Sequence, residues 1–399
     1  MTKRNKVTSM KISVFFDIYC PFHESKDPGQ IPLGLMDNGV DSGVITVAKK
    51  ELENYNPKFE VTQQAVNEFY ADFWLKNNSD AIVTYHARGK SNVPLIEKMK
   101  LGGKKVILKL DSDGKIGHPL QRHHHRVPLK ERFTIANLIS DSYWRLAPKS
   151  LKRRKHAAFA AEITKQIELC NATVIESPEA LSNLNYFLSA WGRSDLIKKT
   201  HFIPNPVTPE FVEGEIGKKE NIAVTHGRWD DYTVKNTALM VETVVEFLTQ
   251  RQDYRFIIFG GGIDRVKKLL EVAPQNVKDR IIIQGFIEHE KVEGILKSAK
   301  ILFVPSRWES FSIASAEALC TGCSIVGTPA EALRYFSMQG FSGSISATFD
   351  KEAIFAALIQ DAIKWDNGEY NPEKTAAFWR PILDRKSVAK SIENLARAS

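Results

Sequence analysis

The chain has 399 residues, of which 43% are hydrophobic and 26% are charged, which is enough for two domains with full hydrophobic cores. No uninterrupted apolar stretch reaches the ~20 residues of a membrane-spanning helix, and residues 1–10 are polar and basic, so we expect a cytoplasmic protein. The four cysteines are scattered, which argues against a disulfide scaffold: they are Cys20, Cys170, Cys320 and Cys323.

Apolar runs alternate with longer helical patterns along the chain, an order typical of parallel βαβ units. The first set of expected strands comprises residues 12–16, 44–47, 81–85, 106–110 and 173–176. Residues 201–209 are rich in proline and are interpreted as a stiff linker. The second set comprises residues 222–225, 256–259, 281–283, 301–304 and 324–326. Two doubly wound sheets joined by a linker predict two Rossmann-like domains that face a ligand-binding cleft.

Two polar segments follow strands of the first set. Residues 26–29 read Lys-Asp-Pro-Gly, and residues 111–114 read Asp-Ser-Asp-Gly. An Asp-x-Asp segment after an apolar strand can hold a divalent cation, whereas a simple turn of Asp and Gly is the plainer alternative. Three adjacent histidines at 123–125 could also ligate a metal, but in a basic stretch we interpret them as solvated or acceptor-facing.

Positive charge is concentrated in residues 115–155, which hold eleven lysines and arginines and two acids and so carry a net charge of +9. The net charge of the whole chain is +8, so the remaining residues sum to about −1. Tyr143, Trp144 and Phe159 are interleaved with this charge, and residues 149–161 combine it with small apolar residues. Such a segment can lie on an anionic membrane surface. A solvated helix face is the structural alternative, and no nucleic-acid-binding motif accompanies the charge.

Basic residues follow the first strand of the second set. His226-Gly227-Arg228 comes directly after residues 222–225, and Lys235 opens a helical pattern shortly afterwards. Glycine lets a ligand approach the backbone closely, and the two cations can neutralise a diphosphate. The alternative is a pair of solvated surface charges. Further along, the strand 256–259 runs into three glycines, 260–262, which by themselves also make an ordinary loop.

Two glutamates, Glu309 and Glu317, lie eight positions apart across a strand–loop–helix junction. The strand 301–304 ends at Pro305, and the residues after Ser312 suit a helix that Ser310 or Ser312 could cap. With Glu309 in the loop and Glu317 in the helix, the two carboxylates can hold opposite ends of one long ligand. The amides of residues 311–313 crown the helix N-terminus and favour a phosphate between them. This arrangement suits a nucleotide sugar.

The segment 304–328 resembles the signature of the retaining glycosyltransferases of family 4, which have the GT-B fold. Their Glu-x7-Glu motif follows a strand that ends in Pro-Ser and precedes Glu-Ala and a later Gly, as in Glu317-Ala318 and Gly322 here. Ser310 and Ser312 stand where glycine is commoner. The resemblance implies an N-terminal acceptor domain of residues 1–204, a donor domain of residues 205–377, and a C-terminal helix, 378–399, that crosses back to the first domain.

The resemblance also implies roles for single residues. Glu309, Arg228 and Lys235 would be catalytic, with the two cations on the donor diphosphate and Glu317 on the ribose. Asp111 and His118 would contact the sugar or the acceptor. The remaining donor contacts would come from Gly29, Gly227, Gly261, Phe286, Ile287, Ser310, Phe311, Ser312 and Ile313.

The implied reaction transfers a hexose with retention from a nucleoside-diphosphate sugar to a glycan or a lipid-linked sugar. The leaving phosphate would take the acceptor proton, so that no protein nucleophile is needed. Asp-x-Asp marks the metal site of the other large transferase fold, GT-A, but here the cations already supply positive charge, and we expect no metal cofactor. Cys320 and Cys323 are interpreted as small packing residues at a helix end.

Other classes of function remain open. A nucleotide-sugar epimerase has the same two-domain architecture and needs no acceptor. A dinucleotide-dependent oxidoreductase would need a Gly-x-Gly-x-x-Gly turn after a strand, which the sequence lacks. A non-catalytic protein that binds anionic lipid or nucleic acid would depend on the basic segment alone. The enzyme reading places the protein in the cytoplasm, peripherally at the inner face of the membrane, and without a nucleic-acid partner.

Overall fold

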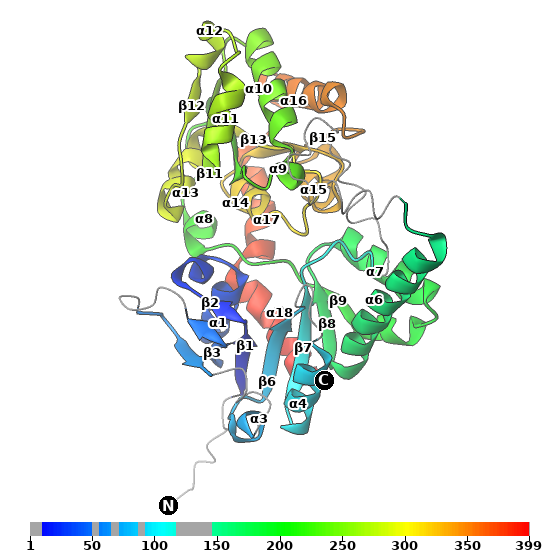
Figure 1. Ribbon diagram of the computed structural model, residues 1–399. Coiled ribbons are helices and arrows are strands. Elements are labelled where there is room, and N and C mark those ends of the chain that lie inside the picture. Colours follow the sequence, from blue (N-terminus) through cyan, green and yellow to red (C-terminus); the bar gives the residue numbers. More distant parts are fainter. Residues whose placement is uncertain (1–9, 50–55, 65–71, 87–91, 117–145, 399) are drawn as a thin grey trace, which may run out of the picture. The chain divides into compact units, whose positions relative to one another are not determined.

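The computed structural model describes residues 10–49, 56–64, 72–86, 92–116 and 146–398. The chain divides into two compact units (Figure 1). The first comprises residues 1–114, 161–208 and 382–399, and the second comprises residues 115–160 and 209–381. His118 and the histidines at 123–125 lie outside the described residues. Of the described helices, none is both long and apolar enough to cross a membrane.

The first unit is built on a parallel sheet with the strand order β5-β3-β1-β6-β7-β8-β9. The strands are β1 (Lys11–Phe15), β3 (Asp41–Thr46), β5 (Glu60–Gln63), β6 (Ala81–Tyr85), β7 (Lys105–Leu110), β8 (Ala172–Ile175) and β9 (Thr200–Phe202). Two short strands, β2 (Ile18–Tyr19) and β4 (Ala48–Lys49), pair separately. Consecutive residues of β1 are buried, from Ile12 to Phe15, so both faces of the sheet are covered.

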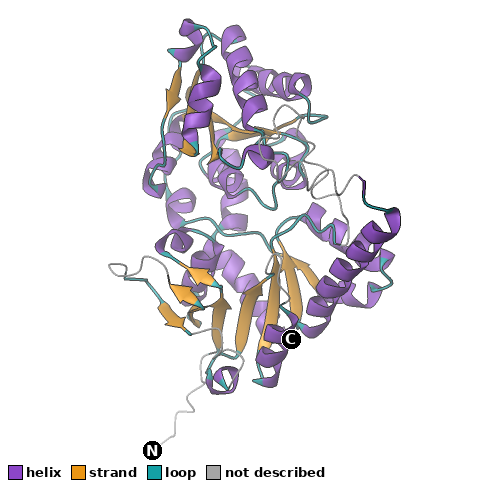
Figure 2. Cartoon of the chain, viewed as in Figure 1, coloured by secondary structure: helices purple, strands orange, loops and turns teal. Residues whose placement is uncertain are grey.

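Helices pack against this sheet (Figure 2). The helices of the first unit, with two 3-10 turns, are η1 (Pro21–Ser25), α1 (Asp27–Asp37), α3 (Phe73–Lys76), α4 (Val93–Leu101), α7 (Pro178–Ala190), η4 (Ser194–Lys199) and α18 (Arg385–Ala398). Helix α6 (Lys149–Leu169) begins in the second unit and ends in the first, which takes it up from residue 161. Helix α7 begins where Ser177 caps it, since the Ser177 side chain accepts from the Ala180 amide at 3.2 Å.

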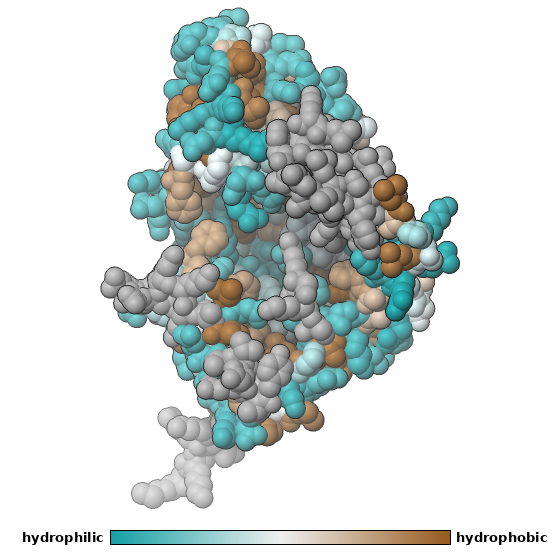
Figure 3. Space-filling view, viewed as in Figure 1, coloured by the Kyte–Doolittle hydropathy of each residue, from teal (hydrophilic) through white to brown (hydrophobic). Residues whose placement is uncertain are grey.

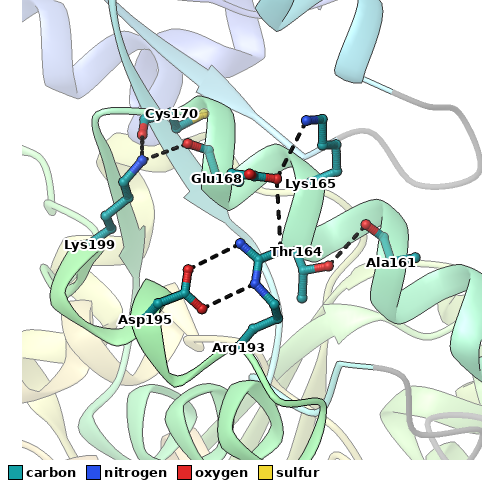
Figure 4. Close-up of polar contacts among 8 residues, drawn as sticks. All are labelled: Ala161, Thr164, Lys165, Glu168, Cys170, Arg193, Asp195 and Lys199. Atoms are coloured by element: carbon teal, nitrogen blue, oxygen red, sulfur yellow. Dashed lines mark hydrogen bonds and ion pairs between the residues drawn. The ribbon is translucent and has the colours of Figure 1, made fainter.

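The C-terminal end of α6 is tied to the chain that follows it (Figure 4). Lys199 donates to the carbonyl oxygens of Glu168 and Cys170, at 2.6 and 2.8 Å. Arg193 lies 3.8 Å from Glu168 and bonds to Asp195. Cations at these carbonyl groups also complement the negative end of the helix dipole. These contacts fix the C-terminal end of α6, whereas the basic residues lie in its first half.

The second unit has a parallel sheet with the strand order β12-β11-β10-β13-β14-β15. The strands are β10 (Glu220–Arg228), β11 (Arg255–Gly261), β12 (Ile281–Ile283), β13 (Ala299–Val304), β14 (Ser324–Gly327) and β15 (Gly343–Ile345). The helices, with one 3-10 turn, are α8 (Pro209–Glu213), α9 (Tyr232–Lys235), α10 (Thr237–Gln250), α11 (Ile263–Leu270), α12 (Gln275–Lys278), α13 (His289–Ser298), α14 (Ile313–Cys320), α15 (Glu331–Ser337), η5 (Met338–Gly340), α16 (Lys351–Asp366) and α17 (Pro372–Leu383).

All the strands expected from apolar runs are present, and the expected pair of parallel α/β sheets is confirmed. The strands that the sequence did not reveal include β5, β9 and β15, each at the end of a sheet. Strand β5 has one neighbour, is exposed or half-buried along its length, and lacks a continuous apolar run in Glu60–Gln63. Strand β9 also corrects the linker interpretation, because His201 and Phe202 belong to the first sheet.

The C-terminal part of the chain returns to the first unit, as expected, but as two helices rather than one. Helices α17 and α18 are separated at Asp384, which pairs with Val207. Val388, Ala389, Ile392 and Ala396 of α18 belong to the core of the first unit. Helix α1 lies against α18, and a Cβ at Gly34 would come within 2.3 Å of the Arg385 carbonyl oxygen, so glycine allows this close approach.

Candidate functional site

The expected donor residues gather at the carboxyl edge of the second sheet. Strand β10 lies between β11 and β13, and all three run parallel. Gly227 and Arg228 therefore end β10 next to Gly260 and Gly261, which end β11. The loop with Glu309 leaves the same edge from β13. This edge is where open parallel sheets bind their ligands.

Lys235 and Glu309 form an ion pair at this edge, with Nζ 2.7 Å from Oε1. Both side chains are largely buried, at 20% and 12% exposed. The alternative of solvated surface charges is therefore wrong for Lys235. The description as a solvated surface charge does fit Arg228, whose side chain is 78% exposed and lies 3.8 Å from Asp231. The exposed guanidinium is accessible to an anionic ligand, whereas the ammonium group of Lys235 already has an acidic partner.

Hydrogen bonds between two loops hold this ion pair together. The Arg307 guanidinium donates to Asn236 Oδ1 from Nε and Nη2, at 3.0 and 2.9 Å, and the Arg307 amide donates to the Val234 carbonyl at 2.8 Å. Asn236 adopts a left-handed conformation with φ 54°, and its amide group donates to the Pro305 carbonyl at 3.3 Å. Residues 234–236 and 305–307 thus form one cross-linked unit that brings Lys235 and Glu309 side by side.

The three glycines after β11 have different structural roles. A Cβ at Gly260 would lie 2.0 Å from the Gly227 carbonyl oxygen, and one at Gly262 would lie 2.4 Å from the Asp230 amide. Both have positive φ, so packing and conformation alone account for glycine there. A Cβ at Gly261 would meet none of the described atoms within 4 Å. Gly261 is therefore the glycine of this turn whose backbone a ligand can approach.

The helix after β13 begins as expected, but without the expected side-chain cap. Ser312 precedes α14 with φ 67°, a left-handed conformation that favours glycine, and its hydroxyl lies 2.8 Å from the Ser315 hydroxyl. Within the described residues, the Ser312 side chain accepts no hydrogen bond from the helix amides. Ser310 is only half buried, whereas Phe311 is fully buried and packs against Phe336. The Ser315 amide donates to the Ser312 carbonyl at 3.0 Å, and the first two amides of α14, at residues 313 and 314, are thus left to a ligand or to water.

Glu317 lies inside α14 and is 2% exposed. Its Oε1 is 3.0 Å from Nε2 of His289, and Nδ1 of the same ring is 3.1 Å from Glu210 Oε1. Sequence reasoning missed His289 and Glu210, because neither belongs to a motif and each follows an ordinary helix start. Sequence reasoning also missed the roles of Arg307 and Asn236. The available signal was their position in the sequence, next to or near Glu309 and Lys235.

Phe286 and Ile287 follow β12 at the same edge. Phe286 is 76% exposed and Ile287 is half buried. The Gly260 amide donates to the Gly285 carbonyl at 3.0 Å, which joins this segment to the glycine turn. An exposed aromatic ring next to an open glycine can stack on a planar ligand.

The remaining predicted residues belong to the first unit. Gly29 is buried in α1, where a Cβ would lie 2.4 Å from the Glu24 Cα, so close packing accounts for it. Asp111 is exposed directly after β7, while Asp113 is buried and its carbonyl accepts from Asn183 at 2.9 Å. The described residues contain no group of three or more His, Cys, Asp or Glu side chains that could hold a metal ion.

A buried charged cluster lies near Asp111. Lys109, at the end of β7, has Nζ 2.7 Å from Glu176 Oε1 and 3.5 Å from Asp27 Oδ2. It also donates to Asn205 in the proline-rich segment. Burial raises the pKa of Glu176 to about 8, although the neighbouring ammonium group opposes this shift. Attraction to Glu176 and Asp27 outweighs burial for Lys109 and raises its pKa, so the lysine stays charged.

Comparison with known proteins gives a match for the second unit. Residues 208–379 match the family model described as "Glycosyl transferases group 1". This part of the chain is therefore similar to the group 1 glycosyltransferases. The cysteines of this domain are buried as the sequence indicated, and the Cys323 thiol donates to the Leu296 carbonyl at 3.1 Å.

Curated relatives match parts of the chain. An uncharacterized glycosyltransferase, YqgM of Bacillus subtilis, is 26% identical over 196 residues, which cover 47% of this chain and 50% of YqgM. The lipopolysaccharide core biosynthesis mannosyltransferase LpsB of Rhizobium meliloti is 29% identical over 177 residues, 41% of this chain and 49% of LpsB. The chain thus matches about half the length of these relatives or less.

Solved structures match nearly the whole chain. WaaG, a glycosyltransferase involved in lipopolysaccharide biosynthesis, has a TM-score of 0.62 with 13% identity, covering 97% of this chain and 100% of WaaG. Anabaena Alr3699/HepE, solved in complex with UDP-glucose, has a TM-score of 0.62 with 14% identity, covering 98% and 100%. At these identities the likeness establishes the fold, and the chain has the GT-B fold expected from its sequence.

Proposed function

We propose that this protein is a retaining glycosyltransferase that moves a hexose from a nucleoside-diphosphate sugar to a glycan or a lipid-linked sugar. One observation carries the proposal: Lys235 and Glu309 are paired at the carboxyl edge of a domain that is similar to the group 1 glycosyltransferases. The names of two relatives support the substrate class, since LpsB is a lipopolysaccharide mannosyltransferase and HepE was solved with UDP-glucose.

In this proposal the second domain binds the donor along the sheet edge. Glu317 holds the ribose, and Arg228 and Lys235 hold the diphosphate, assisted by the first amides of α14. Gly227 and Gly261 let the diphosphate approach the backbone. A Cβ at Gly227 would touch Lys235 Cδ at 3.5 Å, so the lysine side chain passes directly over this glycine. Phe286 and Ile287 lie against the base.

In the proposed reaction, donor binding replaces the ion pair between Lys235 and Glu309 by an ion pair between Lys235 and the diphosphate. When the donor binds, the Lys235 ammonium turns from Glu309 toward the diphosphate, and Glu309 is released to accept hydrogen bonds from sugar hydroxyls. The leaving phosphate takes the proton of the acceptor hydroxyl on the same face of the sugar from which it departs, which retains the configuration. The cations stabilise the charge that develops on the leaving group. These cations make a metal unnecessary.

The acceptor side of the proposal includes an anionic membrane surface. Lys149, Arg153, Arg154 and Lys155 are exposed on α6, and Phe159 is 40% exposed on the same helix. Where α6 begins, at the right of Figure 3, hydrophilic and hydrophobic residues lie side by side. Lysines and arginines attract anionic lipids while an aromatic ring enters the interface. A lipid-linked acceptor carries a diphosphate of its own and suits such a surface.

The test is a donor screen. The purified protein is mixed with UDP-, GDP- and ADP-sugars, and the melting temperature and slow hydrolysis of each donor are measured. We expect at least one donor to raise the melting temperature and to release nucleoside diphosphate, and EDTA to leave this release unchanged. NMR of the released or transferred sugar then reports the anomeric configuration. An inverted product would refute retention, and an isomerised sugar released without acceptor would favour the epimerase alternative.

A further inference from the structure

One polar contact of the second unit places a histidine between two carboxylates. His289 opens α13, Glu317 lies in α14 and Glu210 lies in α8. The imidazole nitrogens are 3.0 Å from Glu317 and 3.1 Å from Glu210. The Phe211 ring meets the imidazole edge to face, with 5.2 Å between centroids. Three helices thus fix the position and the plane of one ring.

Exposure falls along this chain of contacts, from 36% for the Glu210 side chain through 19% for His289 to 3% for Glu317. A carboxylate as buried as Glu317 needs hydrogen-bond donors from the protein or from a ligand. His289 provides one such donor to Oε1. Its orientation is in turn fixed by Glu210, which lies where solvent still reaches.

Both nitrogens of the ring face carboxylate oxygens, and each nitrogen that carries a hydrogen can donate to one of the two acids. The two acids lie on opposite edges of the ring, so together they restrict its rotation.

We infer that His289 is a positioning residue for donor binding, which fixes the Glu317 carboxylate through Oε1 for its contact with the ribose hydroxyls. The inference rests on the proposed function, in which Glu317 binds the ribose. It adds that Glu210 acts indirectly, by fixing the orientation of the His289 ring. The affinity for the ribose then depends on residues from three helices: Glu317 of α14, His289 of α13 and Glu210 of α8.

The experiment combines a change in the protein with a change in the ligand. Dissociation constants are measured by calorimetry for the nucleoside diphosphate that stabilises the wild type most and for its 2′,3′-dideoxy analogue. His289→Phe keeps a ring but removes both ring nitrogens. We expect it to weaken the ribonucleotide about 10- to 100-fold, the range for a hydrogen bond to a charged group, and to weaken the dideoxy analogue by less than about 3-fold.

Two further variants keep the test decisive. His289→Gln retains one donor for Glu317 and should recover part of the loss; it also replaces His289→Phe if that variant does not fold. Glu210→Gln, which removes only the orienting charge, should give a smaller loss confined to the ribonucleotide. His201→Phe, at a half-buried histidine of β9, is the matched control and should change neither constant.

The outcomes separate the inference from the proposed function. Equal losses for both ligands in a folded variant would show that His289 is only structural and overturn the inference. Equal binding of both ligands by the wild type would overturn the ribose contact and the inference with it, while leaving glycosyl transfer to be judged by the donor screen. A wild type that binds no nucleoside diphosphate would overturn both.

Discussion

Lys235 and Glu309 are 74 positions apart in the sequence and only 2.7 Å apart in space. In the proposal they bind different parts of one donor, so in the empty site each neutralises the other. The pairing lowers the cost of keeping two charges in a largely buried place. It also means that the donor exchanges one set of charge contacts for another and does not enter a site of bare charges.

Glu309→Ala should abolish transfer while leaving the protein folded, and Arg228→Ala should do likewise. Removing a group that stabilises charge in the transition state costs about 100-fold or more in kcat. Initial rates with the best donor measure the loss, and circular dichroism checks the fold. Arg255→Ala, an exposed arginine at the other end of β11, is the control and should keep full activity. Full activity in Glu309→Ala or Arg228→Ala would remove that residue from its assigned role.

Ser312→Gly should be tolerated, whereas Ser312→Val should destabilise the protein by about 2 kcal/mol. The backbone of residue 312 is left-handed with φ 67°, where a β-branched side chain is strained. Glycine relieves this strain but loses the hydroxyl contact with Ser315, so the two effects nearly cancel. Urea unfolding of the three proteins provides the comparison. Equal stability of the valine and glycine variants would contradict the conformation described at this position.

At pH 9, where Glu176 is ionised, Lys109→Met alone should destabilise the protein by about 3–5 kcal/mol, because it leaves the carboxylate buried without its cation. Lys109 is 2% exposed and Glu176 is 0% exposed. The double variant Lys109→Met/Glu176→Leu removes both charges and should recover most of the loss. Chemical denaturation of both single variants and the double variant gives the coupling between the two sites. Strictly additive losses would mean that the two residues do not interact energetically.

Asp361 should make the stability depend on pH in an unusual direction. Burial raises the pKa of Asp361 from 3.8 to about 6, although Ser324 and Tyr370 bond to its oxygens. The folded state therefore holds this proton more tightly than the unfolded state. Its contribution is fully present below about pH 4 and is lost as the pH rises through about 6, a change of about 3 kcal/mol.

Asp361→Asn removes this titration, so its stability relative to wild type should rise between pH 4 and pH 7 by about the same 3 kcal/mol. Denaturant unfolding at several pH values measures the difference. Asp264→Asn makes the same substitution at an exposed side chain and is the control; its stability should depend on pH as that of the wild type does. A constant difference between Asp361→Asn and wild type over this range would refute the shift.

A variant with glutamine at the four basic positions of α6 should bind anionic liposomes more weakly and should keep its donor affinity; the positions are Lys152, Arg153, Arg154 and Lys155. Each cation near an anionic surface contributes about 1 kcal/mol, and the effect should fade in high salt. Sedimentation with vesicles that contain or lack phosphatidylglycerol measures it. Lys267→Gln/Lys268→Gln on α11 removes exposed charge elsewhere and is the control. Unchanged liposome binding would leave the α6 cluster as ordinary surface.

Much of the candidate site could be predicted from single stretches of sequence. Glu309 and Glu317 flank a strand–helix junction, and Arg228 follows a strand, so local pattern places all three at a ligand-binding edge. The contacts of His289 with Glu210 and Glu317, and of Asn236 with Arg307, could not be predicted in this way. They join residues from different elements, and nothing in the local sequence around His289 indicates what will face it.

The sequence by itself determined the two parallel sheets, because buried central strands need continuous apolar runs that can be read directly. It also determined which residues end those strands. Only the tertiary structure decided which end residues meet, where the sheets end and how the C-terminal helices divide at Asp384. The physical reason is that these features depend on contacts between distant segments, where a short end strand or a polar side chain is stabilised by its neighbours and not by its own pattern.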